Sequence, residues 1–314
     1  MAKDYTNQHI VPKRYLDRFG TKDGKRTIIG TRIVCKGKVR FFTESTENVG
    51  YIKNYYDVTD KNDPKYWEHY FAREIDTLCG QDMVNIISKV TLSQNDAMVL
   101  SEQDKEVLAK IIVAQLMRIP KSIDYVKTVL YPKVSAQVKD DLISALPPAF
   151  VEKHRALIMN TEFSEQDQKE LILNHSFEPV NFERYCKVLQ DGIWVVYVNV
   201  RRNKTPFVTS DNPVLVESAG SKEMGMFRNG LANPATCIFY PLNPGIAVAI
   251  YSRRGFLGVA ADEYDGRKVL LDELKYIISR NVKIMDQAHR HSFIPQPLYD
   301  VVSDSHSAKC HDPR

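Results

Sequence analysis

The spacing of apolar residues changes once along this chain of 314 residues, and that change constrains the fold more than any other feature. Up to about residue 190 the apolar residues recur at the helical period, whereas after Gly192 they form short β-branched and aromatic runs between Asn, Gly and Pro turns. Helices are predicted over residues 66–79, 107–118, 122–146, 148–159, 164–174, 182–190 and 270–289, and strands over 193–200, 206–209, 214–217, 236–242 and 246–252. Helices followed by strands are typical of the α+β class.

The N-terminal quarter adds smaller elements to this pattern. A short helix is expected within residues 9–19, and two β-branched and aromatic runs, 27–35 and 38–43, predict a hairpin. We therefore expect a single α+β domain over residues 1–302. It should have a mainly helical body, a small, mostly antiparallel sheet from the C-terminal half and an N-terminal β-hairpin. Residues 303–314 are polar and are expected to form a disordered tail.

The net charge of +4 is unevenly distributed. Residues 1–53 hold twelve Lys and Arg against five Asp and Glu, a local charge of +7, so the other 261 residues carry −3. Five single cysteines without a CxxC pair are typical of reduced thiols. The chain has no 18-residue apolar run and no apolar segment at its N-terminus, so we expect a cytoplasmic protein that does not bind membranes.

Polar residues interrupt the apolar stripes of two predicted helices. Gln115 and Arg118 lie on the inward stripe of the 107–118 helix, and Glu74 lies in the middle of the stripe of the 66–79 helix. A buried charge is costly unless it is paired and hydrogen-bonded. Two interpretations follow: a structural Glu74–Arg118 ion pair, or a cleft in which Arg118 holds an anion.

Two short motifs add candidate chemistry. Residues 7–16 include Gln8 and His9, the only histidine among the first 68 residues, and histidine is the commonest general acid or base at neutral pH. Asp211 stands with Ser210 and Asn212 directly after a predicted strand, a usual place for a site. Both motifs also suit structural roles, because His and Gln cap backbone groups and Asp-Asn-Pro forms turns.

Several enzyme classes lack their motifs in this chain. There is no Walker A loop, no GxGxxG, no HExxH and no GxSxG. Nucleotide-driven motors, dinucleotide oxidoreductases, zincins and α/β-hydrolases are therefore disfavoured. The single cysteines provide no context for a thiol nucleophile.

The motifs together resemble a bacterial family known as domain of unknown function 4238. The resemblance rests on Gln8-His9-x-Val11-Pro12-x-x-Tyr15-Leu16-x-x-Phe19, Gln115-x-x-Arg118, Thr209-Ser210-Asp211-Asn212-Pro213 and Tyr240-Pro241-Leu242, and spans about residues 7 to 292. It implies no activity. It does imply that the polar residues above converge in space, namely Gln8, His9, Glu74, Gln115, Arg118, Ser210, Asp211 and Asn212.

The first functional hypothesis is a phosphodiester-cleaving enzyme, most simply a nuclease. The catalytic candidates are His9, Glu74, Arg118 and Asp211, and the substrate-binding candidates are Gln8, Gln115, Ser210 and Asn212. In a metal-free form, His9 is the general acid or base and Arg118 stabilises the phosphorane charge. In a metal form, Glu74 and Asp211 hold Mg²⁺, which activates water. We favour the metal-free form, because the sequence shows no close pair of carboxylates and contains no motif that requires a metal ion.

The alternative hypothesis is a non-catalytic module that binds nucleic acid or an acidic protein through its basic N-terminal lobe. The cations of that lobe are Lys13, Arg14, Arg18, Lys22, Lys25, Arg26, Arg32, Lys36, Lys38 and Arg40. They would make salt-sensitive phosphate contacts, with Tyr15, Phe41 and Phe42 available for stacking on bases. The same cations would also serve simply to solvate a hairpin. An enzyme acting on a small molecule or a protein is a further option.

Overall fold

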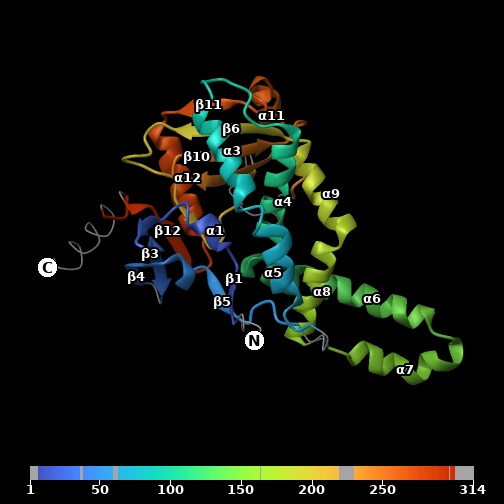
Figure 1. Ribbon diagram of the computed structural model, residues 1–314. Coiled ribbons are helices and arrows are strands. Elements are labelled where there is room, and N and C mark those ends of the chain that lie inside the picture. The colour runs from blue at the N-terminus through green and yellow to red at the C-terminus, as the bar shows by residue number, and fades with distance from the viewer. Residues whose placement is uncertain are drawn as a thin grey trace, which may run out of the picture.

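The computed structural model of the protein describes residues 6–35, 38–58, 63–162, 164–218, 230–296 and 298–300 (Figure 1). These residues form two five-stranded sheets, a two-stranded sheet and a set of helices, which confirms the α+β class. The predicted tail at 303–314 lies outside the described residues. Of the helices in the described ranges, none is long and apolar enough to span a bilayer.

Of the two five-stranded sheets, the one whose strands contain more residues, called the larger sheet below, is built from the C-terminal half, as predicted. Its strands, in spatial order, are β11 (Lys268–Leu271), β6 (Ile193–Asn199), β10 (Ile246–Tyr251), β9 (Thr236–Asn243) and β8 (Leu215–Ser218). Neighbouring strands are antiparallel except β11 and β6, which are parallel. Every residue of the central strand β10 is buried, because both faces of the sheet are covered.

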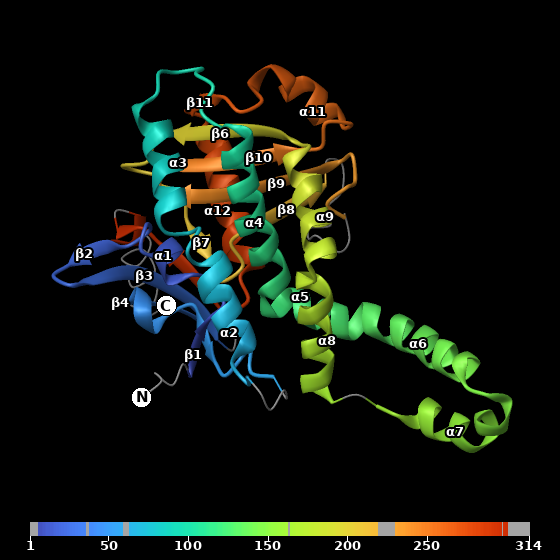
Figure 2. The same ribbon diagram turned by 45° about the vertical axis from the view of Figure 1, so that its right-hand side comes forward.

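Helices cover the two faces of this sheet (Figure 2). On one face lie α3 (Gln81–Leu92), α4 (Glu102–Arg118) and α9 (Pro179–Gln190), and on the other lies α12 (Leu274–Gln287). Since successive strand residues point to opposite faces, Val248 and Ile250 join the core under α4, whereas Ala247 and Ala249 pack with Ile277 of α12.

The second sheet joins the two ends of the chain. Its order is β2 (Thr21–Asp23), β3 (Arg26–Cys35), β12 (His291–Ile294) and β7 (Thr209–Ser210), with β4 (Lys38–Ser45) on the other edge of β3. The predicted N-terminal hairpin is thus confirmed as β3 and β4. Its pairing with β12 was not predicted. The helix α1 (Lys13–Leu16) follows β1 (Asn7–His9), which pairs with β5 (Tyr51–Lys53).

The remaining helices connect the two sheets and form a projecting arm. They are α2 (Tyr66–Tyr70), α5 (Pro120–Tyr125), α6 (Tyr131–Ala145), α7 (Pro148–Asn160), α8 (Glu165–Phe177) and α11 (Phe256–Ala261). The hairpin of α6 and α7 extends away from the body (Figures 1 and 2). A capping box of Ser101 and Asp104 starts α4, which positions the helix that carries Gln115 and Arg118.

The predicted closing helix is wrong at its start. Residues 268–271 form strand β11 rather than the first turn of a helix, and the helix proper begins at Leu274. A short apolar run such as 269–271 suits a buried strand as well as a helix, so its period alone does not distinguish them.

Candidate functional site

The strongest candidate site surrounds Arg118, which is fully buried at the end of α4. Its Nη1 donates to Asp76 Oδ1 at 3.1 Å, and its Nη2 donates to Gln115 Oε1 at 3.4 Å. The guanidinium carbon lies 5.0 Å from the centre of the Phe71 ring, within cation–π range. Burial acts to lower the pKa of Arg118, but Asp76, Tyr56 and Cys79 together outweigh it and raise the pKa above its ordinary value.

Gln115 belongs to the same cluster, as its position three residues before Arg118 predicts. Its Nε2 donates to the Ile10 carbonyl oxygen at 2.7 Å, while its Oε1 accepts from Arg118. Both capacities of the amide are therefore used within the protein. Gln115 ties the N-terminal segment to α4 and holds the guanidinium in place.

The partner of Arg118 corrects the sequence prediction. Glu74 is exposed and pairs with Arg73 at 2.6 Å, whereas Asp76 takes the place predicted for Glu74. The cause is a π-helical segment, Phe71–Ile75, which follows α2. A π turn holds more residues than an α turn, so the inward stripe passes from residue 74 to Ile75. The predicted 3.6-residue stripe does not survive this segment.

His9 lies beside this ion pair on β1. Its ring is half-buried and meets Tyr51 edge-on at 6.0 Å between centroids, and its buried Nε2 has no hydrogen-bond partner among the described residues. Burial lowers the pKa of His9, and the charges of Arg118 and Lys13 add to this, while Asp76 and the Thr46 backbone oppose it. The imidazole is therefore neutral at pH 7 and able to accept a proton.

Gln8 points to the other side of β1, because neighbouring strand residues alternate. It is fully buried, donates through Nε2 to Asp57 Oδ1 at 2.6 Å and accepts from the Tyr56 backbone amide. Tyr56 in turn donates its hydroxyl to the Arg118 carbonyl oxygen at 3.3 Å. Gln8 thus supports the cluster through the 56–57 segment rather than by touching Arg118.

Glu68 is a member of the cluster that sequence reasoning missed. Burial and the neighbouring Asp76 carboxylate raise the pKa of Glu68 to about 7, and Arg118 acts in the opposite direction. Two neighbouring carboxyl groups cannot both ionise without cost. The only sequence signal was the acidic content of the 68–74 stretch, in which Glu68 lies on α2, before the π-helical segment.

Asp211 lies in a second cluster, the Asp211 clamp, formed with Ser210, Asn212 and Gln287. Its carboxylate, 1% exposed, accepts the backbone amides of residues 289, 290 and 291 at 2.7, 2.8 and 2.7 Å. The Nδ1 of His291 lies a further 3.6 Å from Oδ2. The carboxylate therefore fixes the turn between α12 and β12.

Asn212 and Ser210 are also committed to the backbone. Asn212 Nδ2 donates to the Gln287 carbonyl oxygen at 3.1 Å, and Gln287 Nε2 returns hydrogen bonds to the carbonyl oxygens of Asn212 and Val214 at 2.6 and 3.0 Å. Ser210 Oγ donates to the Asn212 carbonyl oxygen at 2.8 Å. The structure thus gives this motif the turn-forming arrangement that was one of its two interpretations.

The predicted convergence is therefore partial. His9, Gln115 and Arg118 come together with Asp76, while Ser210, Asp211 and Asn212 occupy the clamp and Glu74 faces solvent. Since Asp211 spends both oxygens on amides and Glu74 is exposed, these two do not form a common Mg²⁺ site. Within the described ranges, no three His, Cys, Asp or Glu side chains gather in a metal-binding arrangement.

Two buried tyrosines, Tyr15 and Tyr240, lie next to the strand that leads into the Asp211 clamp. The sequence suggested Tyr15 for stacking on bases, but its ring is fully buried, which corrects that expectation. The Tyr15 hydroxyl contacts Thr209 Oγ1 and donates to the Pro241 carbonyl oxygen, both at 2.8 Å. The Tyr15 ring stacks on Tyr240 at 5.2 Å, and burial raises the pKa of both phenols. The Tyr240 hydroxyl is buried and has no hydrogen-bond partner in the part of the chain that the structure describes.

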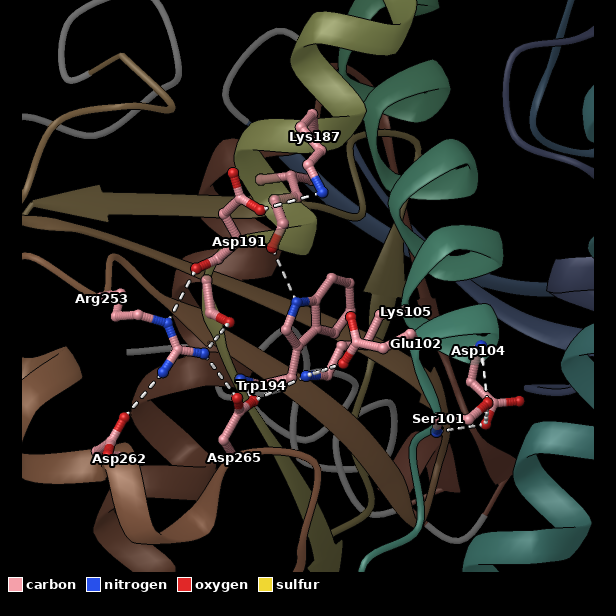
Figure 3. A network of polar contacts seen from close by, with 12 residues as sticks. Ser101, Glu102, Asp104, Lys105, Lys187, Asp191, Trp194, Arg253, Asp262 and Asp265 are labelled. Carbon is pink, nitrogen blue, oxygen red and sulfur yellow. Dashed lines mark hydrogen bonds and ion pairs between the residues drawn. The ribbon is translucent and has the colours of Figure 1, made fainter.

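A third polar network lies around Asp265, at the end of the larger sheet (Figure 3). The charged groups of this network are paired with one another. Asp265 accepts from the Trp194 amide at 2.9 Å and pairs with Lys105 at 3.2 Å and Arg253 at 2.8 Å. These hydrogen bonds and cations lower the pKa of Asp265 against the effect of burial. The network joins α4 to β6 and is structural.

The basic N-terminal lobe is only partly available for binding. Lys13 pairs with Asp17 at 3.1 Å, and Arg18 donates to the carbonyl oxygens of residues 14, 79 and 80. Exposed Arg14 on α1 has no ion pair or side-chain hydrogen bond within the described ranges, and the same holds for five cations of the hairpin region: Lys25, Arg26, Arg32, Lys38 and Arg40. These five lie on β3, β4 and the turn before β3.

Comparison with known proteins gives one family match. The family model described as protein of unknown function (DUF4238) matches residues 7–258, a span that includes the Arg118 cluster and Asp211. No curated protein and no solved structure gives a match.

Proposed function

Because the chain belongs to the DUF4238 family, whose description assigns no activity, we propose a function from the arrangement of its residues: the protein binds single-stranded nucleic acid on the hairpin face. The hairpin face consists of Lys38, Arg40 and Phe42 on β4, with Ile33 on β3 and His291 on β12. This is the alternative function that the sequence suggested. It is carried by one observation, the row of unpaired cations beside an aromatic ring on an edge strand.

The sheet register supports a single binding face. Lys38, Arg40 and Phe42 occupy alternate positions of β4, so they point to the same side. Arg40 stands opposite Ile33, which stands opposite His291 on β12, and residues in register share a face. Phosphates would lie against the two cations, and bases would stack on Phe42.

The burial of Arg118 and Asp211 favours this surface over the deeper clusters. Arg118 is fully buried and Asp211 is 1% exposed, so neither side chain reaches a polymer without rearrangement. Lys38 and Arg40 are exposed. Sequence-independent affinity for nucleic acid comes from such exposed cations, through release of condensed counterions.

Titration of salt tests the proposal. A labelled oligo-dT of about 15 nucleotides, followed by fluorescence anisotropy, should bind wild type with a steep salt dependence. Lys38→Gln with Arg40→Gln should reduce the log–log salt slope by about 1.4, the value expected for two phosphate contacts on a single strand.

The matched control is Lys110→Gln with Lys187→Gln. These cations are paired with Glu106 at 2.6 Å and with Asp191 at 3.3 Å, outside the hairpin face. The control should keep the wild-type slope. Equal slopes in both double variants, or no binding by wild type at low salt, would contradict the proposal.

A second candidate function is phosphodiester hydrolysis, favoured by the unbonded Nε2 of neutral His9. In this reaction a local opening exposes the buried Nε2, and His9 then accepts a proton from the attacking water. The water oxygen bonds to phosphorus, and the bond to the leaving oxygen breaks as that oxygen takes a proton from solvent. Arg118 would act as a positioning residue through its charge. Strand β4 ends at Ser45, and the Thr46 backbone adjoins His9, so a polymer along β4 leads toward this side chain.

Cleavage of labelled RNA and DNA, with Mg²⁺ or with EDTA, tests the second candidate. His9→Gln should slow cleavage by about 100-fold, while His69→Gln, on the exposed side of α2, should keep the wild-type rate. Because burial lowers the pKa of His9, the rate should rise with pH and level off below the ordinary histidine value. Equal cleavage by wild type and His9→Gln would remove His9 from the mechanism, and absence of cleavage would leave binding alone.

A further inference from the structure

A separate groove of about 470 Å³ lies between α3 and the turn that joins β9 to β10. Val84 and Ile87 of α3 form one wall, and Ile246 forms part of the other. Arg18 and Arg202 are its charged lining residues, and none of the described residues that line it is acidic. The groove therefore combines a positive charge with an apolar surface.

Arg18 is a fixed wall of the groove. Its guanidinium donates to the carbonyl oxygens of residues 14, 79 and 80, which hold it in one orientation. Its donors are largely used by these contacts, so its charge contributes to the field rather than gripping a ligand.

Arg202 is the free cation of the groove. The side chain is exposed and makes no hydrogen bond or ion pair with the residues that the structure describes. It lies across Gly245, where an added Cβ would stand 2.8 Å from Arg202 Cδ and 3.7 Å from Nη1. The Asn243 side-chain oxygen accepts the Gly245 amide at 2.7 Å and fixes the turn. Glycine at this position therefore gives Arg202 its place over the groove.

We propose that this groove binds a small organic anion, with the anionic head on Arg202 and an apolar body against Val84, Ile87 and Ile246. A guanidinium can donate two parallel hydrogen bonds to the oxygens of a carboxylate or phosphate head. The volume falls in the range of small-molecule sites, which are mostly apolar with a few polar groups that set orientation. This ligand is independent of the nucleic acid proposed for the hairpin face.

Calorimetric titration with phenyl phosphate and with hexanoate tests the groove. Wild type should bind at least one of them with a Kd of about 1 mM or lower, and Arg202→Gln should weaken that binding about tenfold. Arg201→Gln is the matched control, because the neighbouring Arg201 pairs with Asp272 at 2.8 Å instead of lining the groove. It should change the affinity less than about twofold.

A second variant separates charge from position. Gly245→Ala keeps both arginines but displaces Arg202, and it should weaken the same probe about as much as Arg202→Gln. Inorganic phosphate alone should bind more weakly than phenyl phosphate, because it lacks the apolar body.

Three results would overturn the proposal: no binding of either probe at about 10 mM, equal affinities in Arg202→Gln and Arg201→Gln, or inorganic phosphate binding as tightly as phenyl phosphate. Oligo-dT binding should be unchanged in Arg202→Gln. That readout distinguishes failure of the groove from failure of the hairpin face.

Discussion

The Arg118 cluster and the Asp211 clamp are both buried, both contain a charge, and both come from polar motifs that the sequence marks as candidate sites. In the clamp, three backbone amides meet one carboxylate. In the Arg118 cluster, His9 Nε2 and Arg118 Nε are buried without a hydrogen-bond partner in the described part of the chain. A carboxylate whose hydrogen-bonding capacity is fully used by backbone amides stabilises a turn. Buried polar atoms without a hydrogen-bond partner can still bind a ligand or accept a proton. The number of hydrogen-bond partners of the buried polar groups therefore distinguishes the two regions better than their residue types do.

The largest effect that would test this comparison is expected at the clamp. Asp211→Ala should lower the free energy of unfolding by about 4 kcal/mol, because three backbone amides lose a buried, charged acceptor. Urea unfolding followed by circular dichroism measures the change. Asp272→Ala, which removes an exposed carboxylate, should cost less than about 1 kcal/mol. A loss below about 1 kcal/mol in Asp211→Ala would show that the clamp is not saturated.

A smaller loss is expected in the Arg118 cluster. Arg118→Met should cost about 2–3 kcal/mol, because Asp76 loses its partner but is 28% exposed and regains some hydration. Addition of Asp76→Asn should cost little more, since the unpaired charge is then removed. The two single variants and the double variant form a thermodynamic cycle in urea. Strict additivity would mean that Asp76 and Arg118 are not coupled.

Glu68→Gln should stabilise the protein by an amount that grows as the pH rises from about 4.5 to about 7 and then levels off. The folded-state pKa of Glu68 is raised to about 7, so its contribution to stability is present below the unfolded pKa and is lost as the pH rises through 7. The amide avoids this loss. We expect a gain of about 1 kcal/mol at pH 8, discounted for partial exposure, and none at pH 4.5. Unfolding at both pH values checks this, and an equal gain at both would assign the effect to something other than titration.

The smallest effect is expected at Glu74. Glu74→Gln should change stability by less than about 0.5 kcal/mol, because its only ion pair, with Arg73, is exposed on both sides within the described structure. Asp76→Asn on the same segment should cost more than 1 kcal/mol, roughly, since it faces buried Arg118. These two variants distinguish the π-helical arrangement, in which Asp76 faces Arg118, from the α-helical stripe, in which Glu74 would face it. A larger loss in Glu74→Gln than in Asp76→Asn would contradict it.

Much of the fold followed from local patterns, because helix and strand periods and capping residues act within a few positions. The hairpin at 26–45 and the helix at 102–118 are examples. The pairing of β12 with β3 could not be predicted, because it joins residues about 260 positions apart. The alternating pattern of a strand does not indicate which other strand it pairs with. The strand at 268–271 was lost to the ambiguity of short apolar runs.

The candidate site was predictable to a similar extent. The i, i+3 spacing placed Gln115 and Arg118 together, and the apolar surroundings indicated burial. The partner acid was not predictable, because the inward face of the 66–79 segment depends on hydrogen-bond spacing in the backbone. The role of Asp211 was not predictable either, since the amides of residues 289–291 reach it only after the sheet has formed.

The π-helical segment at Phe71–Ile75 behaves as a one-residue insertion that the helix absorbs without a loop. Deletion of a single residue there would return the segment to α-helical spacing, while the residues after it would keep the faces they occupy now. The choice of the carboxylate that neutralises Arg118 is thus set by a count of residues rather than by their chemistry. A related chain one residue shorter in this stretch would need its acid one position nearer to α2 to keep the same charge balance.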